Sequence, residues 1–128
     1  MKFDIDCARD ILLTVEACKL NDVMYVKDLE NELSQYDPGE ISYMCLKLYE
    51  ADFINATCKK SASVINIVRI NDITYEGHQF LANIREDSVW QKVKHIASSA
   101  GTLSIPIVQK IATECVKAAL LSKFNIQI

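Results

Sequence analysis

The stretch from Asp72 to Arg85 constrains the fold most, because a strand end, a helix cap and a glycine follow one another within it. Thr74 stands where an N-cap residue would accept a hydrogen bond from the first turn of a helix. Gly77 falls inside that turn, at a cost in helix propensity of about 1 kcal/mol relative to alanine. We therefore expect Gly77 to permit close backbone packing against a neighbouring element, and His78 to have a structural role.

Upstream of this stretch, the hydrophobic periodicity predicts helices and a short strand. In chain order, we expect a helix from Asp4 or Asp6 to about residue 19, a strand at 23–26, and helices at 27–35 and from 38 to about 51. The start of the last of these is well marked. Asp37 suits the N-cap, Pro38 the first helical position, and Glu40 can complete a capping box.

Two β-prone runs and further helices complete the chain. Strands at 53–57 and 64–70, joined by a polar tip at 58–63, predict a hairpin before the helix that Thr74 caps. Ser88 is expected to start the next helix by a capping box. That helix would bury one stripe, formed by Val89, Val93, Ile96 and Ala100. Ser104 and Pro106 then introduce a long last helix to about residue 123.

The order helix, strand, helix, helix, strand, strand, helix is that of a winged helix-turn-helix. We therefore expect a mainly α fold with a small β-hairpin, an α+β chain in which C-terminal helices follow a winged helix. Residues 1–84 would form the winged-helix-like domain. Residues 85–128 would form a helical extension that packs on that domain or mediates self-association.

The composition favours a cytoplasmic protein without a catalytic or metal site. The 128 residues include five cysteines, an odd number without a CxxC pair, which is typical of a reducing compartment. The acidic N-terminal residues do not resemble a secretion signal, and the charges of the last helix argue against a membrane span. His78 and His95 lack other ligands at metal-binding spacings. We expect no cofactor, no metal, no membrane partner and no enzymatic activity.

The charge is distributed unevenly along the chain. Residues 1–58 hold twelve Asp/Glu and five Lys/Arg, a net charge of −7, whereas residues 59–128 hold five and nine, a net charge of +4. A helix-turn-helix that binds DNA carries cations near its second helix, because phosphate neutralisation supplies most non-specific affinity. The predicted helix-turn-helix is acidic instead. This argues against DNA as the partner.

Three runs together resemble an uncharacterised family of small proteins from phages, prophages and Firmicutes. They are MKFDIDCARDILLTVE, LYEADFINA and ITYEGHQFLANIREDSVWQKVK, which are spread over most of the chain. The resemblance implies a phage or mobile-element setting and no particular activity. More loosely, Phe53 and Ile54, followed by the hairpin, Gly77 and the pair Phe80 and Leu81, are similar to the wing and post-wing helix of bacterial winged-helix regulators.

The first functional hypothesis is a non-enzymatic protein that docks on a bacterial host or phage protein and regulates or inhibits it. The acidic residues of the second helix and of the start of the third would carry the binding: Asp28, Glu30, Glu32, Asp37 and Glu40. The plainer interpretation of the same residues is a solvated surface. A homodimer through the broadly apolar last helix is a further expectation, and so is a purely scaffolding role of that helix.

The alternative is a dimeric winged-helix transcriptional regulator that binds DNA. Tyr43 and Lys47 lie four residues apart on the predicted recognition helix, where they could enter the major groove. Lys59, Lys60 and Arg69 of the hairpin would contact phosphates. Residues 39–70 hold four Lys/Arg against three Asp/Glu, so the local charge permits this function by a thin margin.

Overall fold

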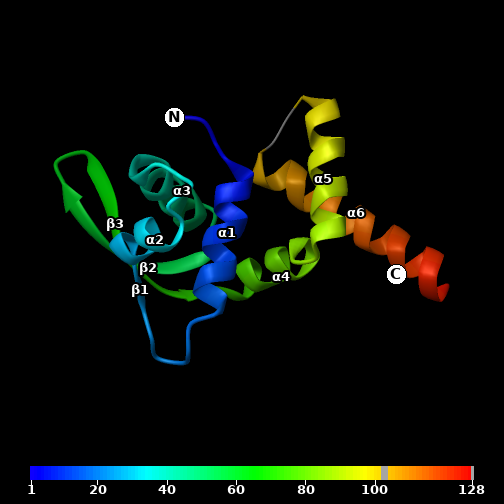
Figure 1. Cartoon of the computed structure of the whole chain (residues 1–128), viewed down its shortest axis with the longest axis horizontal. Coiled ribbons are helices and arrows are strands. Elements are labelled where there is room, and N and C mark those ends of the chain that lie inside the picture. The colour runs from blue at the N-terminus through cyan, green and yellow to red at the C-terminus, as the bar shows by residue number, and fades with distance from the viewer. Residues whose placement is uncertain (102–103, 128) are drawn as a thin grey trace. The chain divides into compact units, whose positions relative to one another are not determined.

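The structure is a computed structural model that describes residues 1–101 and 104–127. These residues are mainly helical with a small three-stranded antiparallel sheet, which confirms the predicted fold class (Figure 1). The chain forms two compact units, Met1–Gln79 and Phe80–Ile128, here called unit 1 and unit 2. The sequence predicts a domain boundary at residue 84. This domain boundary stays a prediction.

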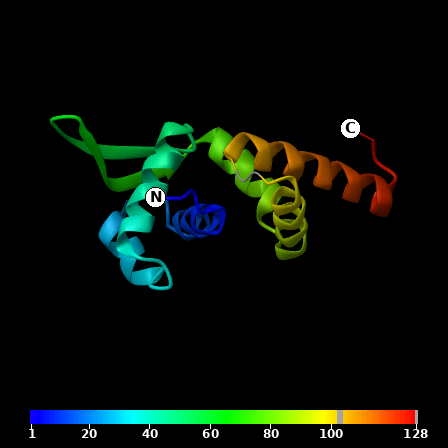
Figure 2. The same cartoon turned by 90° about the horizontal axis from the view of Figure 1, so that it is seen from above.

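Unit 1 has the order of elements that the sequence predicts. Its elements are α1 (Ile5–Glu16), β1 (Met24–Tyr25), α2 (Val26–Glu32), α3 (Pro38–Glu50), β2 (Ile54–Ser61), β3 (Val64–Ile73) and the first half of α4 (Tyr75–Ile84). Helices α1 and α2 end earlier than predicted, at Glu16 and Glu32. The tip of the β2–β3 hairpin projects beyond α2 and α3 in both views (Figure 1, Figure 2).

The sheet has the strand order β1-β3-β2, with β3 in the centre. The predicted polar tip at residues 58–63 is wrong, because Cys58 to Ser61 belong to β2 and pair with β3. The turn consists of Ala62 and Ser63 alone, and Ala62 adopts a positive φ of 53°. Cross-strand pairing along the hairpin outweighs the turn propensity of these polar residues.

The core of unit 1 lies where α1 and α3 pack on each other and on β3. The four apolar residues predicted to face inward from α3 are all fully buried: Ile41, Met44, Cys45 and Leu48. Burial raises the pKa of the Cys45 thiol to about 12, and the charge of Glu30 adds to the increase. All five cysteines lie in the described part of the chain as free thiols.

The structure confirms the roles predicted for Thr74 and Gly77. The Thr74 hydroxyl accepts a hydrogen bond from the Gly77 N–H at 3.1 Å and donates one to the Asp52 carbonyl at 2.6 Å. A Cβ atom at Gly77 would lie only 2.2 Å from the Phe53 carbonyl oxygen. Glycine, which has no Cβ atom, therefore fits at this contact between α4 and the residue before β2. His78, next to Gly77, is exposed, so its role is not that of a core residue.

Two predicted helix caps are not formed, at Asp37 and at Ser88. Asp37 is the residue before α3, but its side chain makes no capping hydrogen bond. Asp4, by contrast, caps α1 by accepting from the Cys7 N–H at 3.1 Å. Ser88 does not cap the helix that follows α4, because that helix begins at Asp87 and the Ser88 hydroxyl donates to Glu86 Oε1 at 2.7 Å.

Unit 2 contains the second half of α4, α5 (Asp87–Ala100) and α6 (Ile105–Phe124). Helices α5 and α6 pack against each other. The buried residues of α5 are Trp90, Val93 and Ala97. The predicted stripe is therefore buried at Val93, half-buried at Val89 and wrong at Ile96 and Ala100. Ile96, a member of that stripe, is 38% exposed. Both stripes have helical spacing, and the face that is buried is the one that includes the large indole of Trp90.

Candidate functional site: a groove between α3 and β3

The acidic residues proposed for docking do not form one surface. Asp28 and Glu32 lie four residues apart on α2 and line a depression beside the loop between α1 and β1. Glu30 faces another part of the surface, since it lines a groove that α2 shares with α3 and β3. Asp37 is exposed, whereas Glu40 is half-buried, and its charge is among the causes that raise the pKa of the Cys7 thiol, after burial, Asp4 and Cys45.

Tyr43 and Lys47 do lie together on α3, as their spacing predicts. The Lys47 Nζ atom is 5.2 Å from the centre of the Tyr43 ring. The same ammonium donates a 2.8 Å hydrogen bond to Glu50 Oε1, and this bond raises the pKa of Lys47. A phosphate at Lys47 would have to compete with that carboxylate, although an exposed ion pair of this kind is worth only about 1 kcal/mol or less.

The three cations of the hairpin are divided between the two faces of the sheet. Lys59 pairs with Asn66 and Lys60 with Ile65 in the register, and neighbouring residues of a strand point to opposite faces. Arg69 lies on the face of Thr57, because its Nε donates to Thr57 Oγ1 at 3.1 Å. Thr57 and Lys59 share a face, since they are two residues apart on β2. Lys60 therefore points away from the face that holds Lys59 and Arg69.

A largely apolar groove of about 720 Å³ runs between α3 and the hairpin. We call it the α3–β3 groove. Ser42, Tyr43 and Leu46 of α3 form one wall. The segment Val64–Val68 of β3 forms the opposite wall, and Tyr25, Val26, Lys27, Glu30, Gly39 and Met1 complete the lining. Five of these side chains are both large and well exposed: Met1 at 71%, Tyr25 at 44%, Val64 at 51%, Ile65 at 38% and Val68 at 39%.

Sequence reasoning missed this groove, although a signal for it was present. The run from Val64 to Val68 is apolar at four of five positions, so both faces of the strand carry apolar side chains. A hairpin with one solvated face would alternate apolar and polar residues there. Such a run on a projecting hairpin predicts either a second packed layer or an exposed apolar patch, and the structure has the patch.

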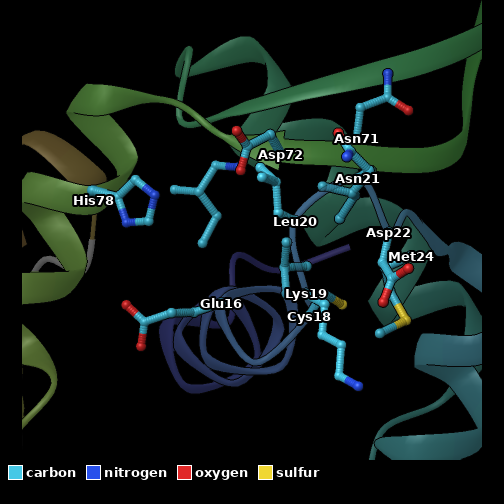
Figure 3. Close-up of a pocket in the computed structure, with 13 residues that line it drawn as sticks. Glu16, Cys18, Lys19, Leu20, Asn21, Asp22, Met24, Asn71, Asp72 and His78 are labelled. Carbon is cyan, nitrogen blue, oxygen red and sulfur yellow. The ribbon is translucent and has the colours of Figure 1, made fainter.

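A second, more polar cavity of about 360 Å³ lies between α1, the loop after it, β3 and α4 (Figure 3). Glu16, Asp72 and His78 come to it from three different elements, and Figure 3 shows them on separate walls. The Asp72 carboxylate accepts a hydrogen bond from the Ile73 N–H at 2.8 Å, a bond local to β3. Among the described residues, no group of three or more His, Cys, Asp or Glu side chains could hold a metal ion.

The last helix packs within unit 2 and also keeps apolar side chains exposed. Val108, Ala112 and Cys115 are its buried residues. Ile107 at 37%, Leu121 at 46% and Phe124 at 67% are exposed, so the helix retains apolar surface outside its contact with α5. Within the described ranges, no helix is both long enough and apolar enough to cross a membrane.

Two of the comparisons with known proteins match most of the chain. An uncharacterised protein of Haemophilus influenzae is 27% identical over 121 residues, which are 94% of this chain and 99% of that protein. No solved structure matches the chain. Residues 2–103 match the family described as "Hypothetical protein (DUF2513)", so the match includes α1 to α5 and ends before α6. The chain belongs to the DUF2513 family.

Proposed function

We propose that unit 1 is a winged-helix domain that acts without catalysis, by docking on another protein. The winged-helix assignment is supported by the order α1-β1-α2-α3-β2-β3 and by the strand order β1-β3-β2. Helix α3 would then occupy the place of the recognition helix, and the hairpin that of the wing. Because a fold does not imply a function, the function has to come from the surface that these elements form.

The observation that carries the proposal is the apolar character of the α3–β3 groove. A surface that binds DNA is strongly positive, because it neutralises phosphates. The groove instead exposes Tyr25, Val64, Ile65 and Val68, and the charged side chains in its lining are Lys27 and Glu30. Exposed apolar surface rimmed by polar residues is typical of a site for another protein. The net charge of −6 on residues 1–79, which hold fourteen Asp/Glu and eight Lys/Arg, also disfavours DNA.

The partner that we propose is a bacterial host or phage protein, which the protein would regulate or inhibit. This part of the proposal rests on the resemblance to phage and prophage proteins. The acidic side chains of α2 and α3 would steer a basic partner towards the groove, since complementary charge raises the association rate.

The docking proposal can be tested with a pair of exposed residues. Val68 lines the groove and is 39% exposed, whereas Tyr75 at the start of α4 is outside it and is 74% exposed. We expect a bacterial lysate treated with nuclease to yield a stoichiometric protein partner with the wild type and with Tyr75→Asp. Val68→Asp should lose that partner while retaining the helical circular dichroism signal. Recovery of nucleic acid alone from an untreated lysate would refute the proposal.

The second candidate function, a DNA-binding dimer, is favoured by one observation. Lys59 and Arg69 share a sheet face, on which Arg69 Nε also donates to Asn71 Oδ1 at 3.1 Å. If that face contacts phosphates, Lys59→Ala should weaken binding to a duplex and flatten its salt dependence. Lys60→Ala should have less effect, because Lys60 points to the other face. Equal effects of the two substitutions, or none, would remove this candidate.

A further inference from the structure

The central strand β3 has a free edge along the α3–β3 groove. One edge of β3 pairs with β2 from Val64 to Ile73. The other edge pairs with β1 only at Arg69 and Ile70. In the part of the chain that the structure describes, no strand pairs with Val64–Val68 on that second edge. The groove wall formed by this segment is therefore an open sheet edge that continues the short strand β1.

The geometry of the hairpin determines which N–H and C=O groups of β3 point towards this open edge. Ser61 and Val64 flank the two-residue turn, and in such a hairpin they face each other as a hydrogen-bonded pair. In an antiparallel ladder, successive residues direct their N–H and C=O groups to opposite sides. Counting from Val64, the groups of Ile65 and Ile67 point away from β2 towards the free edge. These are the donors and acceptors that a further strand would use.

The side chains beside this edge suit a strand more than a helix or a nucleic acid. A strand added to a sheet edge gains specificity from pockets for its alternate side chains. Tyr43 and Leu46 face the edge from α3, and exposed Ile65 and Val68 lie along it. Apolar side chains at alternate positions of an added strand would be buried between these two walls.

The charges in and around the groove favour particular residues at the ends of such a strand. Glu30 lines the groove and belongs to an acidic helix, α2, in a unit with a net charge of −6. Lys27, one turn earlier on α2, also lines the groove, so the lining itself holds one positive and one negative side chain. A segment flanked by its own Lys or Arg would pair with Glu30 and gain from the acidic surroundings.

We infer that the α3–β3 groove binds an extended segment of a partner protein, which adds as a strand to the free edge of β3 at Ile65 and Ile67. The segment carries apolar residues at alternate positions and a flanking Lys or Arg. This inference rests on the proposed docking function and names the chemistry of the partner. Docking through α2 alone would leave the proposed function intact and overturn the inference.

The probe is a display library of random twelve-residue peptides, selected on the immobilised full chain. We expect enriched peptides to share alternating apolar residues with at least one Lys or Arg. Ile65→Pro removes the N–H at the free edge of β3. A strand tolerates proline where its N–H is not paired with a neighbouring strand. Ile65→Ala shortens the same side chain and keeps the N–H. The selected peptide should bind Ile65→Pro about tenfold more weakly than Ile65→Ala. Equal affinities would overturn the inference.

Hydrogen exchange on the unaltered chain gives a readout that does not depend on a variant. The bound peptide should slow exchange of the Ile65 and Ile67 amides by about tenfold or more. The Asn66 amide, which points to β2, should change little. Enriched peptides with helical spacing, or unchanged exchange at Ile65 and Ile67, would overturn the inference. So would a self-associating chain whose dimer is lost in Ile65→Pro, because a second copy would then occupy the groove.

Variants of two glutamates in unit 1 test whether peptide binding depends on Glu30 itself or on the net negative charge of the unit. Glu30→Gln should weaken binding of the selected peptide by about threefold at low salt. Glu50→Gln is the matched control, because Glu50 pairs with Lys47 and does not line the groove. The same loss in both variants would show that net charge, and not Glu30, attracts the basic flank.

Discussion

Among single residues, a few positions of unit 1 make close contacts or hydrogen bonds that tie the fold together. Gly77 lies so close to the Phe53 carbonyl that a Cβ would overlap it. Thr74 bonds both the first turn of α4 and the Asp52 carbonyl. Tyr36 donates a 2.6 Å hydrogen bond to Asp10 Oδ2, and its pKa is raised by burial and by this bond. Apart from the bond within the first turn of α4, these contacts join segments that are distant in the sequence.

Gly77→Ala should destabilise the protein despite the better helix propensity of alanine. The new Cβ would lie 2.2 Å from the Phe53 oxygen and 2.6 Å from Ile73 Cγ2, so backbone has to move. We expect a loss of about 2–3 kcal/mol in the free energy of unfolding, measured with urea. Gly39→Ala is the control, because its Cβ would meet only the flexible end of Met1. It should be neutral or gain up to about 1 kcal/mol.

At the scale of elements, the sequence predicts the identity and order of the helices better than their ends and buried faces. Asp37 has the position of an N-cap without its hydrogen bond, whereas Asp4 makes the bond. The apolar positions of α3 are predicted correctly, and those of α5 are not. Helical periodicity indicates that a stripe exists. Where two stripes overlap, the packing partner decides which one is buried.

Asp4→Ala and Asp37→Ala should differ in their effect on stability. Asp4→Ala removes the bond to the Cys7 N–H and should cost about 1 kcal/mol of unfolding free energy. Asp37→Ala removes no capping bond and should cost less than about 0.5 kcal/mol. Urea titrations of both variants measure this difference. Equal losses would mean that the charge near each helix end matters more than the hydrogen bond.

The buried face of α5 can be tested with two alanines. Ala97 is fully buried, whereas Ala100, a member of the predicted stripe, is exposed. Ala97→Leu should overpack the interior of unit 2 and lower the thermal midpoint, at a cost of about 1–3 kcal/mol. Ala100→Leu should change stability by less than about 0.5 kcal/mol. The reverse ranking would restore the stripe that the sequence predicts.

For the whole molecule, the net charge differs in sign between the two units. Residues 1–79 carry a net charge of −6, and residues 80–128, with six Lys/Arg and three Asp/Glu, carry +3. The acidic unit holds the α3–β3 groove, and it also holds the buried thiols Cys7 and Cys45, whose pKa values are raised by burial first and then by nearby charges. The pH dependence of stability should therefore originate largely in unit 1.

The protein should lose stability in alkaline solution. A thiol whose folded-state pKa is raised from 9.0 to about 12 stabilises the fold fully below pH 9, and that contribution falls as the pH rises towards 12. For Cys45 the slope is at most about 1.4 kcal/mol per pH unit. Urea titrations between pH 8 and about 11 should show the decline. Cys45→Ala, compared with its own stability at neutral pH, should decline less steeply, and an unchanged slope would exclude Cys45 as a cause.

Features that depend on near neighbours in the chain could be predicted from the sequence. Periodicity gave the helices, the order of elements and the core of α3, and local cap chemistry gave the roles of Thr74 and Gly77. Which side chains meet across elements could not be predicted in this way, because it depends on contacts between distant segments. The two-residue turn and the register of β2 on β3 separate Lys59 from Lys60 and aim Ile65 and Ile67 at a free edge. A shift of one residue would reverse every face, because strand side chains alternate, and that register is set by pairing between distant segments.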